Sequence, residues 1–114
     1  MEAKWVKSDT GRWLPLRTFD VENASGSGVY VIWHGGIFPR IVRIGRGDIK
    51  TRLLAERDDA EVVRHGWYAT LYVTWAILPA SYQKGVERYL VNRWPPRVAD
   101  TVPDVHPIAV NAPW

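Results

Sequence analysis

The sequence predicts a small α+β sandwich in which a central three-stranded antiparallel sheet is flanked by helices. Two segments with strand character, residues 28–34 and 40–45, are close enough to form a hairpin. A helical segment follows the second, and a long aromatic and β-branched segment at residues 67–78 precedes another helix. The 114 residues correspond to one domain, and the absence of cysteine excludes disulfides, thiolate metal sites and thiol nucleophiles.

Residues 1–27 are expected to form a partly irregular N-terminal extension before this domain. They lack clear hydrophobic periodicity and end in the flexible stretch NASGSG. Within them, RWLPLRTF (residues 12–19) is compatible with a short edge strand only, because Pro15 cannot donate a hydrogen bond in a central strand.

Residues 28–34 are predicted to form the first strand of the hairpin. Alternation divides its side chains between two faces, with Val29, Val31 and Trp33 on one and Tyr30, Ile32 and His34 on the other. Residues 35–39 form the turn, and residues 40–45 form the second strand.

A helix is predicted to begin directly after the hairpin, because Asp48 is a suitable N-cap for IKTRLLAERDD. Ile49 and Leu53 mark its buried face, and Arg52 lies near the edge of that face. Residues 60–66 are expected to add one or two helical turns that end at Gly66.

The segment WYATLYVTWAIL, residues 67–78, is predicted to be the longest strand, and Pro79 ends it. Ser81 is expected to cap the last helix, at roughly residues 81–94. Glu87 lies at the flank of the apolar stripe of this helix, which comprises Val86, Tyr89, Leu90 and Trp94. The proline-rich tail is expected to be extended.

This order of elements, together with its motifs, resembles the GIY-YIG nuclease family. GVY at 28–30 matches the first motif, and RIG at 43–45 matches two of three positions of the second. Arg52 stands where the family has its helix arginine, and VERYLVNRWPP places Glu87 at the position of the metal-binding glutamate. VNAPW supplies Asn111 for the late asparagine. The resemblance covers residues 28–114, which are therefore expected to form a GIY-YIG-like nuclease domain.

The resemblance implies a divalent-metal-dependent endonuclease that hydrolyses DNA phosphodiester bonds with Mg²⁺ or Mn²⁺. It implies that Glu87 holds the metal and that Tyr30 and Arg52 belong to the catalytic group. A guanidinium suits phosphate oxygens, and a single carboxylate can hold Mg²⁺ together with water and substrate phosphate. His34 is a further candidate base, because imidazole titrates near neutral pH.

The second motif has lost its tyrosine to Arg43, which cannot accept a proton. Glu56 also occupies a place where the family often has a histidine or a similar polar residue. The base is then Tyr30, His34 or a metal-bound hydroxide, unless the chain does not hydrolyse at all. Tyr30 would need nearby positive charge to ionise. The alternative function is therefore a catalytically degenerate module that binds nucleic acid or a protein partner without cleaving.

Glu87 and Arg52 also have purely structural interpretations. Glu87 is compatible with an exposed helix glutamate paired with Arg88 or Lys84. Arg52 is compatible with an i,i+4 surface pair to Asp48 or Glu56, which is worth only a few tenths of a kcal/mol.

Charge and tryptophan content bear on possible partners. The net charge of +3 is too small to indicate nucleic acid by itself. The basic residues within 40–57 suggest either a phosphate-binding surface or a solvated helix face, and the candidate substrate-binding residues are Arg43, Arg46, Lys50 and Asn111. Seven tryptophans suit core packing, stacking on bases or a protein interface.

No stretch is apolar enough for a signal peptide or a membrane span, so a soluble, cytoplasmic protein is expected. The resemblance implies that its partner is DNA. A double-strand cut by one small active site would require a homodimer or sequential nicks, and the sequence favours neither.

Overall fold

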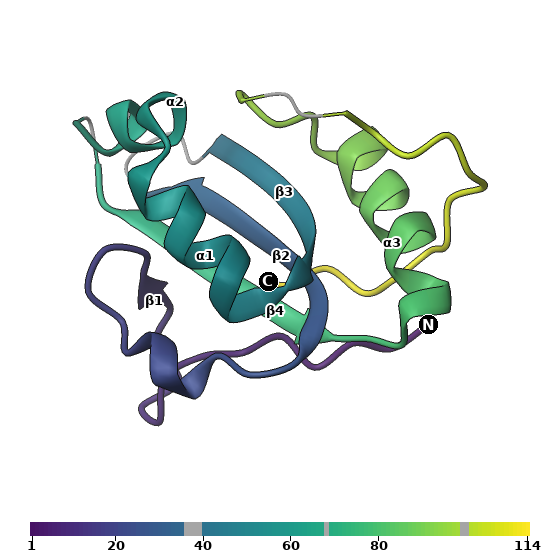
Figure 1. Cartoon of the computed structure of the whole chain (residues 1–114), viewed down its shortest axis with the longest axis horizontal. Coiled ribbons are helices and arrows are strands. Elements are labelled where there is room, and N and C mark those ends of the chain that lie inside the picture. Colours follow the sequence, from purple (N-terminus) through teal and green to yellow (C-terminus); the bar gives the residue numbers. More distant parts are fainter. Residues whose placement is uncertain (36–39, 68, 99–100) are drawn as a thin grey trace.

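A four-stranded antiparallel sheet organises the chain (Figure 1), and the computed structural model describes residues 1–35, 40–67, 69–98 and 101–114. Its strands are β1 (Leu14–Pro15), β2 (Ser27–His34), β3 (Arg40–Asp48) and β4 (Leu71–Ile77), in the order β1-β4-β2-β3. The predicted α+β class is confirmed. The prediction of three strands is wrong, because the short edge strand β1 pairs with β4 and adds a fourth.

The predicted hairpin is formed by β2 and β3, with Tyr30 opposite Gly45 and Val29 opposite Arg46. β3 continues to Asp48, beyond the expected end at residue 45, because Gly47 and Asp48 still pair with the first residues of β2. Gly47 has a φ of 128°, a backbone conformation that favours glycine. The expected turn falls largely on residues 36–39, which lie outside the described residues.

The helix α1 (Ile49–Asp58) begins where the sequence predicts, and the Asp48 side chain accepts a hydrogen bond from the Thr51 amide at 3.0 Å. Asp59 caps the short helix α2 (Ala60–Val63) in the same way. A 3-10 turn, η2 (Arg64–Trp67), follows, so the expected helical turns after α1 are confirmed.

Two predicted boundaries are wrong around the last strand. β4 begins at Leu71 and not at residue 67, because Leu71 pairs with His34, the last residue of β2. Trp67 belongs instead to the 3-10 turn. The helix α3 (Ala80–Arg93) has Pro79 as its N-cap, without a side-chain cap, so Ser81 lies inside the first turn and does not cap it.

The sheet has a helical layer on each face: α1 covers one and α3 covers the other (Figure 1). The core on the α1 face includes Tyr30, Ile32, Ile49 and Leu53. The core on the α3 face includes Val29, Val31, Ile44, Val86 and Leu90. The predicted alternation along β2 thus sends Tyr30 and Val29 to opposite layers.

The predicted N-terminal extension packs on the same sheet as the rest of the chain. Val6 donates a backbone hydrogen bond to Trp75 at 3.0 Å, and Leu16 is fully buried in the α1-face core. A short 3-10 helix, η1 (Val21–Asn23), leads into β2. The tail passes around α3 (Figure 1) and binds it through the amide of Ile108 and the carbonyl of Gly85. No helix in the described part of the chain is long and apolar enough to span a membrane.

Candidate active site

Tyr30 and Gly45 face each other across β2 and β3, and the tyrosine ring lies over the glycine. A Cβ atom added to Gly45 would lie 2.3 Å from the Tyr30 hydroxyl oxygen and 2.4 Å from Cζ. Tyr30 is fully buried on the α1 face. The glycine of the second motif is therefore required by sterics, because any side chain at position 45 would displace the ring.

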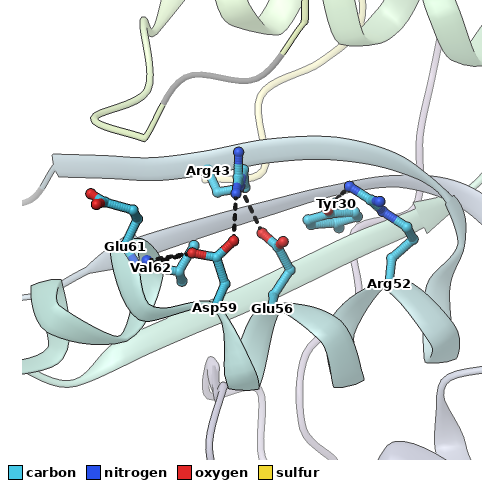
Figure 2. A network of polar contacts seen from close by, with 7 residues as sticks. All are labelled: Tyr30, Arg43, Arg52, Glu56, Asp59, Glu61 and Val62. Carbon is cyan, nitrogen blue, oxygen red and sulfur yellow. Dashed lines mark hydrogen bonds and ion pairs between the residues drawn. The ribbon is translucent and has the colours of Figure 1, made fainter.

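Arg52 of α1 lies beside Tyr30 on the same face of the sheet (Figure 2). Its Nη2 donates a hydrogen bond to the Tyr30 hydroxyl at 3.1 Å. Its aliphatic part passes close to Gly47, where an added Cβ would lie 3.3 Å from Arg52 Cγ. Asp48, a candidate surface partner of Arg52, instead accepts hydrogen bonds from Thr51. Two glycines of β3 thus make room for a stacked tyrosine and arginine.

Arg46, between the two glycines, points to the opposite face of the sheet. Its Nε lies 3.2 Å from Oε1 of Glu87 on α3. Glu87 is only 6% exposed, so the interpretation of this residue as an exposed helix glutamate is wrong. Glu87 is a buried carboxylate that faces the edge strand.

These four side chains, Tyr30, Arg46, Arg52 and Glu87, are called the edge site below. β3 is the last strand of the sheet. Tyr30 and Arg52 lie on the α1 face beside Gly45 and Gly47, whereas Arg46 and Glu87 lie on the α3 face. The structure brings these four sequence-predicted residues to one short stretch of backbone.

The Tyr30 hydroxyl is held in its protonated form. Burial, reinforced by the negative charge of Glu56, raises the pKa of Tyr30 from 10.0 to about 12, although Arg52 and Arg43 act to lower it. The positive charge expected around Tyr30 is thus present but is outweighed by desolvation. A phenol with this pKa is a poor base at neutral pH.

Arg43 belongs to a separate ion-pair network between β3 and the end of α1 (Figure 2). Its Nε donates to Glu56 Oε2 at 2.9 Å, and its Nη2 donates to Asp59 Oδ2 at 3.0 Å. The Arg43 side chain is 9% exposed and that of Glu56 is 5% exposed. Burial raises the pKa of Glu56, and Arg43 opposes that shift only in part. Arg43 is therefore bound inside the protein rather than presented on the edge.

His34 lies at the far end of β2 and is not brought to the edge site. It is four residues from Tyr30, about 13 Å along the strand. Its Nδ1 lies 2.9 Å from the carbonyl oxygen of Gly35. Burial lowers the pKa of His65, and His34 and Arg97 are among the nearby groups that lower it further. His34 therefore lies near these residues and not near Arg52.

The other two predicted substrate-binding residues have different surroundings. Asn111 Oδ1 accepts from the Ala3 amide at 2.6 Å, and its Nδ2 donates to the Ala3 carbonyl at 3.0 Å. Its side chain holds the N-terminal segment. Lys50, in the first turn of α1, is 41% exposed and forms a surface ion pair with Glu22 at 2.9 Å.

The edge site offers few protein ligands to Mg²⁺. Glu87 offers one carboxylate, which is sufficient where water and a substrate phosphate supply the remaining oxygen ligands. The described residues contain no group of three or more histidine, aspartate or glutamate side chains able to hold a metal ion.

Comparison with protein-family models, with curated proteins and with solved structures gave no match. The likeness to GIY-YIG nucleases therefore rests on the motifs and on their placement. Sequence reasoning missed the Arg43–Glu56–Asp59 network, although a signal was present. Arg43 and Glu56 are two departures from one family pattern, and they carry opposite charges on adjacent elements.

Proposed function

We propose that this protein is a divalent-metal-dependent endonuclease that hydrolyses DNA phosphodiester bonds at the edge site. One observation carries the proposal: Tyr30 and Arg52 on one face, and Arg46 and Glu87 on the other, converge on residues 45–47 of an edge strand. An acidic residue buried at a phosphate-binding edge would repel DNA unless a cation neutralises it. Arg46, 3.2 Å from Glu87, supplies part of that positive charge, and a bound divalent ion would supply the rest.

Arg52 is proposed to contact the scissile phosphate. Its planar guanidinium can hold two phosphate oxygens at once and can stabilise the charge that develops on them during cleavage. It is half-buried, and Gly47 packs against its stem. Such a fixed cation loses little freedom on binding, so its electrostatic contribution is available in the transition state.

Tyr30 is proposed to position Arg52 and not to act as the base. The hydroxyl accepts a hydrogen bond from Arg52 and is enclosed by the protein, while burial raises its pKa to about 12. Its proton therefore stays in place during turnover at neutral pH. The contribution of Tyr30 is to fix the direction in which the guanidinium points.

Glu87 is proposed to hold the divalent ion, with Arg46 orienting the carboxylate. A bound Mg²⁺ would polarise the phosphate, activate a water molecule and stabilise the leaving oxygen. The Arg46 Nε lies 3.2 Å from Glu87 Oε1, an ion-pair distance at which it attracts the carboxylate. The same arginine carries positive charge to the edge where the DNA backbone would lie.

A binding module without cleavage is the second candidate, and one observation favours it. The position at which the family has a second tyrosine is Arg43, which is bound to Glu56 and Asp59. Tyr30 keeps its proton. If a protein base is indispensable, this arrangement can hold a phosphate without cutting it.

The two functions are separated by a plasmid-nicking assay. Purified protein is incubated with supercoiled DNA and Mg²⁺ or Mn²⁺, and in parallel with chelator. Arg52→Ala is compared with Arg64→Ala, since Arg64 forms only an exposed pair with Glu61. We expect metal-dependent nicking that falls about 10²–10³-fold in Arg52→Ala and is unchanged in Arg64→Ala. Binding without nicking on plasmid, single-stranded and branched DNA would favour the second candidate.

A further inference from the structure

A pocket of about 490 Å³ lies at the other end of β3 from the edge site, within the size range of small-ligand pockets. Its lining contains four tryptophans and three arginines. The lining residues are Trp13, Trp33, Arg40, Ile41, Arg93, Trp94, Pro95, Arg97 and Trp114. This set is called the tryptophan pocket.

The tryptophans form one continuous aromatic surface. The Trp114 ring centroid lies 5.4 Å from that of Trp33 and 5.5 Å from that of Trp94, and Trp13 packs edge-on against Trp33 at 5.0 Å. Trp33 is buried, whereas Trp114 is 51% exposed. A half-exposed indole supported from behind by other indoles offers a rigid flat surface to a planar ligand.

The charged side chains that line the pocket are all arginines. Arg40, Arg93 and Arg97 are exposed, and no acidic residue belongs to the lining given above. The guanidinium carbon of Arg93 lies 5.3 Å from the Trp94 ring centroid. The amide of Arg97 donates to the Ile41 carbonyl at 3.0 Å, which fixes the segment after α3 against β3. Cations and aromatic rings are thus interleaved on one surface.

Composition, and not size, distinguishes this pocket. Two other pockets have volumes of about 460 and 490 Å³, but each is lined by one tryptophan, and one of them includes Asp9 and Asp20. Stacked indoles beside arginines are the combination that holds single-stranded nucleic acid, in which bases stack on rings and cations follow the phosphates.

We propose that the tryptophan pocket binds an unpaired nucleobase of single-stranded DNA. Trp114 would stack with the base, Trp94, at 62° to Trp114, would border it edge-on, and Arg40, Arg93 and Arg97 would contact the flanking phosphates. Ile41 in this pocket and the edge site at residues 45–47 lie on the same strand, about 17 Å apart. A single DNA strand of a few nucleotides can span this distance.

Combined with the proposed nuclease function, on which this part rests, the arrangement specifies the kind of substrate. One strand would run along β3, with its scissile phosphate at the edge site and an unpaired base in the tryptophan pocket. The substrate would therefore be single-stranded DNA, or a duplex that is opened close to the cut.

The test is equilibrium binding in chelator, so that cleavage does not contribute. Fluorescence anisotropy is measured with a labelled thymidine oligonucleotide of about 12 nucleotides, within the usual site size. A duplex of equal length and an oligonucleotide of abasic sites serve as comparison ligands. We expect the single strand to bind at least about tenfold more tightly than either, because only it offers unpaired bases for stacking.

Trp114→Ala is expected to weaken single-strand binding about 5- to 100-fold, and Trp114→Phe is expected to retain most of it. Trp67→Ala is the matched control, since Trp67 is 81% exposed and lies outside the tryptophan pocket. Arg93→Ala tests the pocket without removing an indole. It should reduce the slope of log affinity against log salt by about one.

Unchanged affinity in Trp114→Ala and Arg93→Ala would overturn the proposal, as would equal affinity for the single strand and the duplex. An absence of DNA binding would overturn it too and would direct attention to a protein ligand. The outcome is separate from that of the nuclease proposal. Nicking by the wild type with no effect of Trp114→Ala on binding would remove the pocket's role alone.

Discussion

Arg43 and Glu56 form a buried ion pair, with Nε of the arginine 2.9 Å from Oε2 of the glutamate. These two residues are also the two positions at which the motifs depart from the GIY-YIG pattern. A buried arginine requires an anionic partner, and Glu56 provides it one layer away. The two positions that differ from the pattern are therefore in direct contact with each other, and Arg43 forms a structural contact in this protein.

The ion pair predicts a strongly non-additive mutant cycle. Arg43→Met leaves Glu56 buried without its nearest cation, so it should lower the free energy of unfolding by about 3–5 kcal/mol. The double variant Arg43→Met/Glu56→Met should recover most of that loss, because no buried charge remains at the two positions. Urea unfolding of the wild type, both single variants and the double variant measures the coupling. Additive losses would show that the pair is not energetically linked.

The buried hydroxyl of Tyr30 predicts a loss of stability at alkaline pH. Its pKa in the folded state is raised from 10.0 to about 12, so the unfolded chain releases this proton first. The free energy of unfolding should therefore fall as pH rises from about 10 to about 12, by up to about 3 kcal/mol. Tyr30→Phe lacks this group and should show a flatter decline. Parallel declines in the two proteins would contradict the assignment.

Tyr30→Phe also tests the positioning role at neutral pH. The variant keeps the ring over Gly45 but removes the acceptor for Arg52, so the guanidinium loses its fixed direction. We expect nicking to fall about 10²-fold, with DNA affinity nearly unchanged. The pH–rate profile of the wild type should show no ionisation of Tyr30 between about pH 6 and 9. A rate that tracks tyrosine ionisation would instead identify Tyr30 as the base.

The approach of Tyr30 to Gly45 predicts that the smallest side chain is not tolerated there. In Gly45→Ala the new methyl group would lie 2.3 Å from the Tyr30 hydroxyl, so the ring must move away from Arg52. We expect a loss of about 1–3 kcal/mol in stability and a loss of nicking. Gly66→Ala is the control, because its Cβ would meet only the flexible Leu71 side chain at 3.3 Å. Equal effects of both substitutions would argue against the steric role of Gly45.

Replacement of Lys50 is expected to change the salt dependence of DNA binding. The surface pair with Glu22 contributes little to stability, so both residues can be replaced without unfolding the protein. Lys50→Ala should weaken DNA binding and reduce the salt slope by about one, whereas Glu22→Gln should strengthen binding by removing a competing anion. Anisotropy titrations at several salt concentrations measure both. A neutral result for both would place Lys50 outside the DNA-binding surface.

Much of the fold follows from local sequence signals. Asp48 caps a helix because its carboxylate reaches the Thr51 amide, and the alternation along β2 separates Val29 from Tyr30. The short edge strand expected within residues 12–19 is confirmed as β1, but its partner was not predicted, because Leu14 pairs with Val73, far along the chain. Trp67 has strand propensity but no opposing residue in β2. In both segments, pairing with a distant strand, and not local propensity, determines which residues form the strand.

The candidate site was predictable to the extent that it depends on motifs. Tyr30, Arg52 and Glu87 were selected from the resemblance to the GIY-YIG motifs. The structure joins Tyr30 to Arg52 on one face of the sheet and Glu87 to Arg46 on the other. The burial of Arg43 was missed, because it depends on the approach of Glu56 in α1 and of Asp59, which follows that helix, to β3. The tryptophan pocket was not predicted either, because its indoles come from positions between 13 and 114 that share no local pattern.

The most direct test of the account is the single-turnover cleavage rate of Glu87→Gln, measured beside its DNA affinity. Glutamine keeps the shape of the buried side chain but removes its charge, and Glu61→Gln on the exposed surface of α2 is the control. The account predicts that wild type and Glu61→Gln cleave DNA with Mg²⁺. It also predicts that Glu87→Gln binds DNA as tightly as the wild type but cleaves at least about 10²-fold more slowly. Equal cleavage by Glu87→Gln, or no cleavage by the folded wild type, would contradict it.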